Sequence, residues 1–227
     1  MIAMPFLVKI CGLSTIETLD AALDAGADMI GLVRFPRSPR HVDLDQGRAL
    51  SERALGRAQR VALLVDPTDE DLAATMAALT PDLVQLHGHE TPERVAAIRA
   101  RTGLPVMKAI GIGDEEDLAG IPAHAAVADR LLLDAKPPRD AGALPGGNGL
   151  SFDWRLIAAL DPGRPMMLSG GLNPQNVGEA IGLTGVRGVD VSSGVESAPG
   201  VKDPDRIAAF VKAARAAFER PRKAITA

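Results

Sequence analysis

The chain has 227 residues, a formal net charge of −4 and only 3% aromatic residues. That length suits one larger domain or two small ones. A hydrophobic share of 46% and a charged share of 24% are ordinary for a globular protein. Without a dense basic run or many aromatic side chains, the chain lacks the usual means of neutralising phosphates and stacking on bases. We therefore expect no nucleic-acid partner.

The single cysteine, Cys11, rules out an intrachain disulfide and a zinc-ribbon pattern, which fits a reducing compartment. The opening sequence MIAMPFLVKIC lacks the charged and long apolar regions of a signal peptide. No apolar stretch reaches the roughly 18 residues that a membrane span needs. These features predict a cytoplasmic protein with no membrane partner.

Short apolar runs alternate with amphipathic segments along the whole chain. The runs show little strict alternation of apolar and polar residues, which is typical of strands buried on both faces of a parallel sheet. In chain order they are FLVKIC (6–11), MIGLV (29–33), VALLV (61–65), DLVQL (82–86), VMKAI (106–110), RLLLD (130–134), PMMLS (165–169) and GVDVS (188–192).

The segments between these runs carry helix start signals. Ser14 and Glu17 form a capping-box pattern after the first run, and Gly26 is placed to end that helix. The segment GDEEDLAGIP, after the fifth run, is short and is expected to end at Pro122. Further start signals are Thr68, Thr91-Pro92, Asn173-Pro174 and Asp203-Pro204.

Eight strand candidates, each followed by a helix candidate, predict an α/β fold of the (β/α)8 TIM-barrel type. A doubly wound dinucleotide-binding sheet would need G-x-G-x-x-G in its first turn, where this chain reads CGLST. No linker divides the chain, so residues 1–227 are expected to form a single domain. We interpret Pro137 to Gly149 as a mobile loop and residues 220–227 as a frayed tail.

In such a barrel the active site lies at the carboxyl ends of the strands. Taken singly, a buried thiol, a solvated strand-end Asp or a hydrogen-bonded His is the commoner explanation of a polar residue there. Three arginines in RFPRSPRH would face the same mouth and suit a ligand carboxylate, which arginine binds bidentately. The pair His87 and His89 has no obvious third ligand, so no metal site is expected.

Two glycine-bearing turns, LSGGLNPQN and VSSGVES, follow the last two runs. Small residues let backbone N–H groups approach an oxyanion, and a helix N-terminus adds favourable partial charge. The loops after strands 7 and 8 are a frequent phosphate site of these barrels. The two turns therefore predict a site for a phosphate group.

These stretches resemble the phosphoribosylanthranilate isomerase family of tryptophan biosynthesis, and the resemblance runs from Lys9 to Asp203. It implies a (β/α)8 barrel that needs no cofactor and converts N-(5'-phosphoribosyl)anthranilate to the corresponding 1-deoxyribulose 5-phosphate by an Amadori rearrangement. The stretches that carry it are VKICGL, GADMIGLV, SPRHV, LVQLHG, LLLDA, GGNGLSFDW, LSGGLNPQNV and VDVSSGVESAPGVKD.

The resemblance also implies roles for single residues. The general base falls on Cys11, the general acid on Asp134 and the carboxylate-binding arginine on Arg40. Arg34 departs from the family, which often has an aromatic or apolar residue there, and it leaves open which arginine faces the anthranilate ring. The remaining expected contacts are Gln85, His87 and Asp190 for the substrate, and Gly170, Gly171, Ser192, Ser193 and Gly194 for its phosphate.

The chemistry needs an acid that protonates the ring oxygen as the C–O bond breaks, and a base that takes a proton from carbon 2 of the resulting iminium. We expect burial to raise the pKa of Asp134 from near 3.9. We expect the pKa of Cys11 to lie below the ordinary thiol value of about 8.5. Lys9 or a helix N-terminus could lower it.

Two other functions are considered. An indole-forming synthase would use a catalytic Lys and Glu set, and a histidine-pathway isomerase would use two Asp residues; Cys11 on the first strand disfavours both. A sugar-phosphate sensor without turnover would be expected to have lost Cys11 and Asp134, and both are present. The expected partner is a small phosphorylated substrate, and both a monomer and a homodimer stay open.

Overall fold

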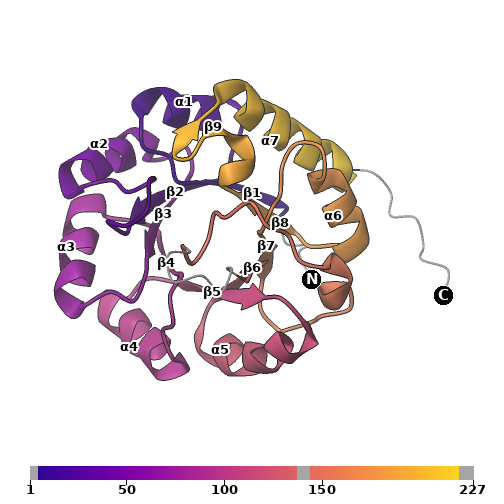
Figure 1. Cartoon of the computed structure of the whole chain (residues 1–227). Helices are drawn as coiled ribbons and strands as arrows, with labels where there is room; N and C mark the ends of the chain where they lie inside the picture. Colours follow the sequence, from indigo (N-terminus) through magenta and orange to yellow (C-terminus); the bar gives the residue numbers. More distant parts are fainter. Residues whose placement is uncertain (1–4, 137–143, 220–227) are drawn as a thin grey trace.

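The structure, a computed structural model, describes residues 5–136 and 144–219. Parallel strands β1 to β8 close into a barrel in chain order, ringed by helices (Figure 1). The predicted fold and its eight strands are confirmed. The strands are β1 (Leu7–Cys11), β2 (Met29–Arg34), β3 (Gln59–Leu64), β4 (Leu83–Leu86), β5 (Val106–Ile112), β6 (Arg130–Ala135), β7 (Met166–Leu168) and β8 (Gly188–Val191).

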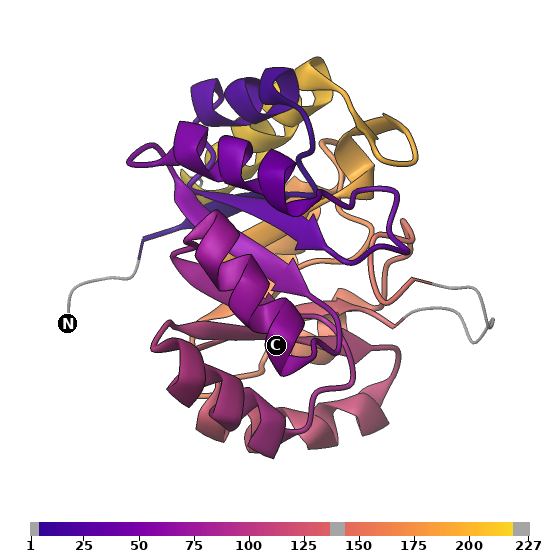
Figure 2. The same cartoon turned by 90° about the vertical axis from the view of Figure 1, so that its left-hand side faces the viewer.

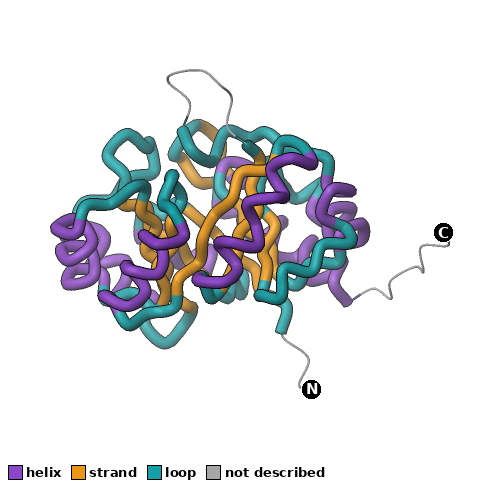
Figure 3. Tube along the Cα trace, turned by 90° about the horizontal axis from the view of Figure 1, so that it is seen from below, coloured by secondary structure: helices purple, strands orange, loops and turns teal. Residues whose placement is uncertain are grey.

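The helices lie outside the strands (Figure 3). They are α1 (Ile16–Asp24), α2 (Leu44–Ala54), α3 (Asp69–Leu79), α4 (Pro92–Thr102), α5 (Ile121–Val127), α6 (Val177–Thr184) and α7 (Pro204–Glu219), with 3-10 helices η1 (Glu115–Gly120), η2 (Trp154–Ile157) and η3 (Ser193–Val195). Between β6 and β7 the described residues form only η2, where a full helix was expected. The loop before it and the Asp161-Pro162-Gly163 turn after it leave room for little more than one turn. No helix of the described residues is long and apolar enough to cross a bilayer.

Several helix starts follow the sequence signals. Thr68 and Thr91 cap α3 and α4, with their hydroxyls accepting from backbone N–H groups three residues on. Asp203 accepts from the N–H groups of Asp205 and Arg206 at the start of α7. These polar side chains satisfy amides that have no partner inside the helix.

Three expected boundaries are wrong. Thr15, not Ser14, caps α1. The helix α6 begins only at Val177, because Asn173 instead closes a turn: its side-chain oxygen accepts from the backbone N–H groups of Gln175 and Asn176. Pro122 lies in the first turn of α5 rather than ending a helix, and a proline there sacrifices no helical hydrogen bond.

The inside of the barrel is packed at the amino ends of its strands. The apolar side chains that fill it are Met29, Val61, Leu83, Met107, Ala109, Leu132 and Met167. A larger core lies between the strands and the surrounding helices. The filled floor leaves only the carboxyl ends of the strands open to a ligand.

A short antiparallel hairpin follows β8 and was not predicted. Its strands are β9 (Glu196–Ala198) and β10 (Val201–Lys202). Figure 2 shows it beside the barrel on the side to which the strand arrows point. The hairpin therefore lies at the same end of the barrel as the predicted site.

Candidate active site

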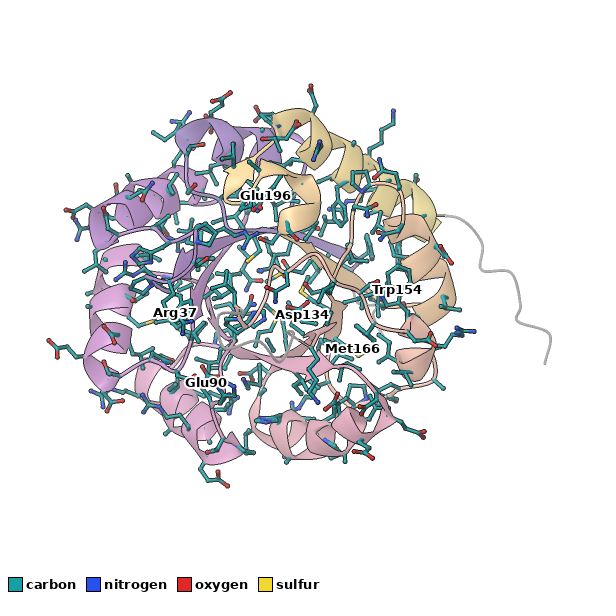
Figure 4. All side chains as sticks on the ribbon, viewed as in Figure 1. Arg37, Glu90, Asp134, Trp154, Met166 and Glu196 are labelled. Carbon is teal, nitrogen blue, oxygen red and sulfur yellow. The ribbon has the colours of Figure 1, made fainter. Side chains whose placement is uncertain are left out.

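The carboxyl ends of the strands open into two adjoining pockets. The first is lined by Cys11, Arg40 and His87 among others. The second lies along the turns after β7 and β8. Asp134 and Asp190 line both pockets. Figure 4 shows Asp134 inside the ring of strands.

Cys11 lies at the end of β1 beside a buried ion pair. Lys9 and Asp190 are direct neighbours on β1 and β8, and Lys9 Nζ donates to Asp190 Oδ1 at 2.8 Å. Residues two apart in a strand share a face, so Lys9 and Cys11 both point into the barrel. The Lys9 side chain is fully buried, and Cys11 is 4% exposed. The thiol thus has a cation next to it and one face toward the first pocket.

The pKa of Cys11 differs from the expectation. Burial raises it above the ordinary thiol value; Lys9 lowers it and Asp190 raises it, and the net direction is upward. The neighbouring cation is visible in the sequence, whereas the loss of water around the thiolate, which outweighs it, is not. Lys9 does face the thiol, yet it only limits the rise in the pKa of Cys11.

Asp134 ends a relay of side chains from β4 to β6. Its Oδ2 lies 3.1 Å from His87 Nε2, and His87 Nδ1 lies 3.0 Å from Gln85 Nε2. With the Gln85 amide donating to Nδ1, the ring N–H lies on Nε2 and donates to the carboxylate. Asp134 Oδ1 accepts from the N–H of Ala135 at 2.9 Å. The predicted residues Gln85, His87 and Asp134 therefore form one hydrogen-bonded unit.

A second buried ion pair fixes the loop that carries His87. Lys108 Nζ donates to Glu90 Oε2 and to the carbonyl of Gly88, both at 2.7 Å. Glu90 also accepts from the backbone N–H groups of Gly88 and Asp66, which joins the loops after β3 and β4. Glu90 lies between the strands and α4 (Figure 4). The backbone directly after His87 is thus held on both sides.

Arg40 reaches the first pocket with one edge already occupied. Its Nε and Nη2 donate to the two carboxylate oxygens of Glu196 at 2.7 and 2.9 Å, and Nη2 also donates to the carbonyl of Gly147 at 3.2 Å. No described residue accepts from Nη1. The bidentate edge expected for a ligand carboxylate is therefore used by the protein, and Nη1 is the nitrogen left for a ligand.

Arg34 does not face the pockets. Its Nη1 donates to the carbonyl of Val42 at 2.5 Å and lies 3.4 Å from His41 Nε2. The pocket wall near it is apolar, and its members are Val33, Phe35, Leu63 and Val65, around Cys11. These wall residues escaped the sequence reasoning, because an apolar strand end looks the same whether it packs in a core or lines a site.

The two glycine-bearing turns line the second pocket. Gly170, Gly171, Ser192 and Ser193 border it, whereas Gly194 packs behind, against the backbone of Leu172 and Asn173. The N–H groups of Gly170 and Gly171 make no hydrogen bond with other described residues. Such amides can bind an oxyanion. The helix α6 begins beyond these residues, at Val177, whereas the 3-10 helix η3 begins at Ser193 on the border of this pocket.

Residues 144–150, between β6 and η2, border both pockets. Residues 144–147 line the first pocket and residues 147–150 the second. The earlier part of the predicted mobile loop, residues 137–143, lies outside the described residues, as does the predicted tail at 220–227. Among the described residues, no group of three or more His, Cys, Asp or Glu side chains could hold a metal ion.

The sequence matches the family model for N-(5'-phosphoribosyl)anthranilate isomerase over residues 8–213. The chain belongs to this family. It is 64% identical over 210 residues to the N-(5'-phosphoribosyl)anthranilate isomerase of Azorhizobium caulinodans, covering 92% of each chain. It is 59% identical over 212 residues to that of Beijerinckia indica, covering 93% of this chain and 95% of the relative.

Solved structures of this isomerase share its architecture. The phosphoribosylanthranilate isomerase of Thermotoga maritima superposes with a TM-score of 0.83 at 36% identity, over 93% of this chain and 99% of that one. A phosphoribosylanthranilate isomerase in complex with reduced 1-(o-carboxyphenylamino)-1-deoxyribulose 5-phosphate superposes with a TM-score of 0.81 at 34% identity, with the same coverage.

Proposed function

We propose that this chain isomerises N-(5'-phosphoribosyl)anthranilate in tryptophan biosynthesis, with Cys11 as general base and Asp134 as general acid. The observation that supports these roles is that both side chains line one pocket, which Arg40 also lines and which adjoins the two glycine-bearing turns. The substrate has a phosphate at one end and a carboxylate at the other. The second pocket suits the phosphate, and Arg40 with the apolar wall suits the anthranilate ring.

The steps follow from these positions. Asp134 protonates the ring oxygen as the bond from carbon 1 to that oxygen breaks, which leaves an iminium. The Cys11 thiolate removes the proton on carbon 2, and the enolamine tautomerises to the ketone. Lys9 lies next to the thiolate that forms. The iminium, a second positive charge in the pocket, further favours a thiolate over a thiol whose pKa is raised at rest.

The relay behind Asp134 suits a group that must hold and release a proton. Gln85 Oε1 is buried without a hydrogen-bond partner among the described residues. If the Gln85 amide turned over, this oxygen would accept from a protonated His87 Nδ1, and His87 Nε2 would then accept from a protonated Asp134. The same three side chains can thus support Asp134 with or without its proton.

The fluorescence of anthranilate provides the test. Substrate generated in situ should lose its signal on turnover by the wild-type protein, whereas binding alone should leave the signal in place. The Asp134→Asn variant should bind but lose turnover by roughly 10²–10⁴-fold, the usual contribution of a positioned acid. A signal that persists with wild-type protein would favour the sugar-phosphate sensor instead.

The remaining expectations belong to the same proposal. We place the enzyme in the cytoplasm, as one domain over residues 1–227, working without a cofactor as a monomer or a homodimer. Family membership supports the location, since the pathway's substrates are phosphorylated metabolites. A solved relative from Thermotoga maritima is described as dimeric and has also been obtained as monomers, and size-exclusion chromatography with light scattering would decide between the two states here.

A further inference from the structure

The stretch VESAPGVKD forms the hairpin after β8, and the proposed reaction gives it no role. The two charged side chains on the hairpin strands turn inward: Glu196 is 7% exposed and Lys202 is 5% exposed. Glu196 lies on the hairpin side of the barrel mouth, away from Asp134 (Figure 4). Burying two charges is costly unless each is fully paired, so their partners indicate what the hairpin does.

Glu196 bonds to residues from two different loops. Its Oε1 accepts from Arg40 Nε at 2.7 Å and from Lys202 Nζ at 2.6 Å. Its Oε2 accepts from Arg40 Nη2 at 2.9 Å and from the N–H of Gly200 at 3.2 Å. Four donors therefore surround one carboxylate, and two of them belong to the arginine proposed to bind the substrate carboxylate.

Lys202 connects the same carboxylate to the phosphate turn, which is the turn after β8 that borders the second pocket with Ser192 and Ser193. Its Nζ donates to the carbonyl of Ser192 at 2.9 Å and lies 3.2 Å from Ser192 Oγ. Ser192 Oγ in turn donates to the carbonyl of Cys11 at 3.1 Å. A continuous buried chain thus runs from Arg40 through Glu196 and Lys202 to the turn that borders the phosphate pocket.

Gly200 and Asp203, two further residues of the stretch VESAPGVKD, also have structural roles in the hairpin. Gly200 has φ +81°, and a Cβ there would lie 2.6 Å from the carbonyl oxygen of Pro39, so only glycine lets the hairpin pack against the loop that carries Arg40. Asp203, directly after Lys202, starts α7. The motif is therefore anchored at both ends.

We infer that Glu196 is a positioning residue for substrate binding, which holds Arg40 with Nη1 toward the pocket, and that Lys202 ties this arginine to the phosphate turn. Arginine has five N–H donors in a fixed plane. Three of the five are taken by Glu196 and Gly147, which leaves the two on Nη1. The hairpin thereby sets the distance and angle between the sites for the two ends of the substrate. The inference rests on the proposed role of Arg40.

A double-mutant cycle tests the link to Arg40. Glu196→Gln should raise KM about tenfold and change kcat less than about threefold, because it loosens binding and leaves Cys11 and Asp134 in place. Arg40→Ala should raise KM at least as much. If Glu196 acts through Arg40, the double variant should have the KM of Arg40→Ala within about twofold. Additive effects, or an unchanged KM in Glu196→Gln, would overturn the inference.

A second measurement tests the link to the phosphate turn, with inorganic phosphate as the probe. Lys202→Met should weaken competitive inhibition by inorganic phosphate about tenfold, while Glu52→Gln, at an exposed glutamate of α2, should leave KM, kcat and this inhibition unchanged. Inhibition that is equal in Lys202→Met and wild type would overturn this part.

If Glu196→Gln does not fold, Glu196→Asp keeps the charge on a shorter side chain and should raise KM in the same direction. An unchanged KM in Glu196→Asp would again contradict the inference. If the wild-type protein shows no turnover at all, it is the proposed function that is refuted.

Discussion

At the residue scale, burial and charge act against each other on the proposed base. The sequence shows Lys9 two positions before Cys11, and the shared strand face makes their proximity predictable. It does not show how completely the barrel removes water from the thiol, which depends on side chains from several strands. The direction of the Cys11 pKa therefore required the structure.

This direction predicts the pH dependence of turnover. When one group must be protonated and another unprotonated, kcat/KM is bell-shaped, and the group with the higher pKa sets the alkaline limb. Because the Cys11 pKa is raised, kcat/KM should fall only above the ordinary thiol value of about 8.5. A kcat/KM profile measured across the alkaline range checks this. A limb well below that value would show that another group titrates.

The two arginines after β2 give a second prediction at this scale. Arg40→Ala should raise KM by the equivalent of a charged hydrogen bond, roughly 1.5–3 kcal/mol. Arg34→Ala serves as the matched control and should change KM little, because Arg34 bonds to the Val42 carbonyl and does not line the pocket. Steady-state kinetics on both variants decides it, and the reverse ranking would place the carboxylate site elsewhere.

At the element scale, the eight strands could be predicted because each is an apolar run between helix signals. The hairpin β9–β10 could not, since its strands are three and two residues long and carry charged side chains inward. Its buried charges are stable only because they pair with each other, with Ser192 and with Arg40, and Arg40 lies 156 positions away from Glu196 in the sequence. Glu196 and Lys202 belong to the stretch that carried the family resemblance, and that was the one available signal.

The turn after β7 yields a prediction about phosphate binding. Gly171 has φ +64°, and a Cβ there would lie 2.8 Å from the carbonyl of Leu150. Gly171→Ala should therefore displace the loop that covers the second pocket and weaken substrate binding and inhibition by inorganic phosphate together. Inhibition constants measured on this variant check the effect. Phosphate inhibition equal to that of the wild type would put the phosphate outside this turn.

At the scale of the whole molecule, one barrel brings residues from both ends of the chain to one mouth. The closing pair of strands, β1 and β8, sets Lys9 beside Asp190 although 181 positions separate them. The barrel prediction already implied that these strand ends meet. The exact pairings, such as Arg40 with Glu196 rather than with a ligand, depend on loop conformations that no local pattern encodes.

The buried carboxylate of Glu196 also affects overall stability. Burial acts to raise its pKa, but Arg40 and Lys202 outweigh it and hold the pKa below the usual value. A lowered pKa in the folded state gives stability that is present above the unfolded-state value of about 4.3 and is lost as the pH falls through the folded value. The thermal midpoint should thus fall in acid, and less steeply in Glu196→Gln. Identical acid slopes would contradict this assignment.

The central claim is that the thiol of Cys11 takes the proton from carbon 2, and the turnover of Cys11→Ser tests it most directly. Serine is close in size, but its hydroxyl is far less acidic, so the variant should keep its thermal midpoint. The anthranilate fluorescence of the substrate should nevertheless fall roughly 10²–10⁴-fold more slowly with this variant than with the wild type. Near-normal turnover by a folded Cys11→Ser variant would show that Cys11 only fills space at the barrel mouth.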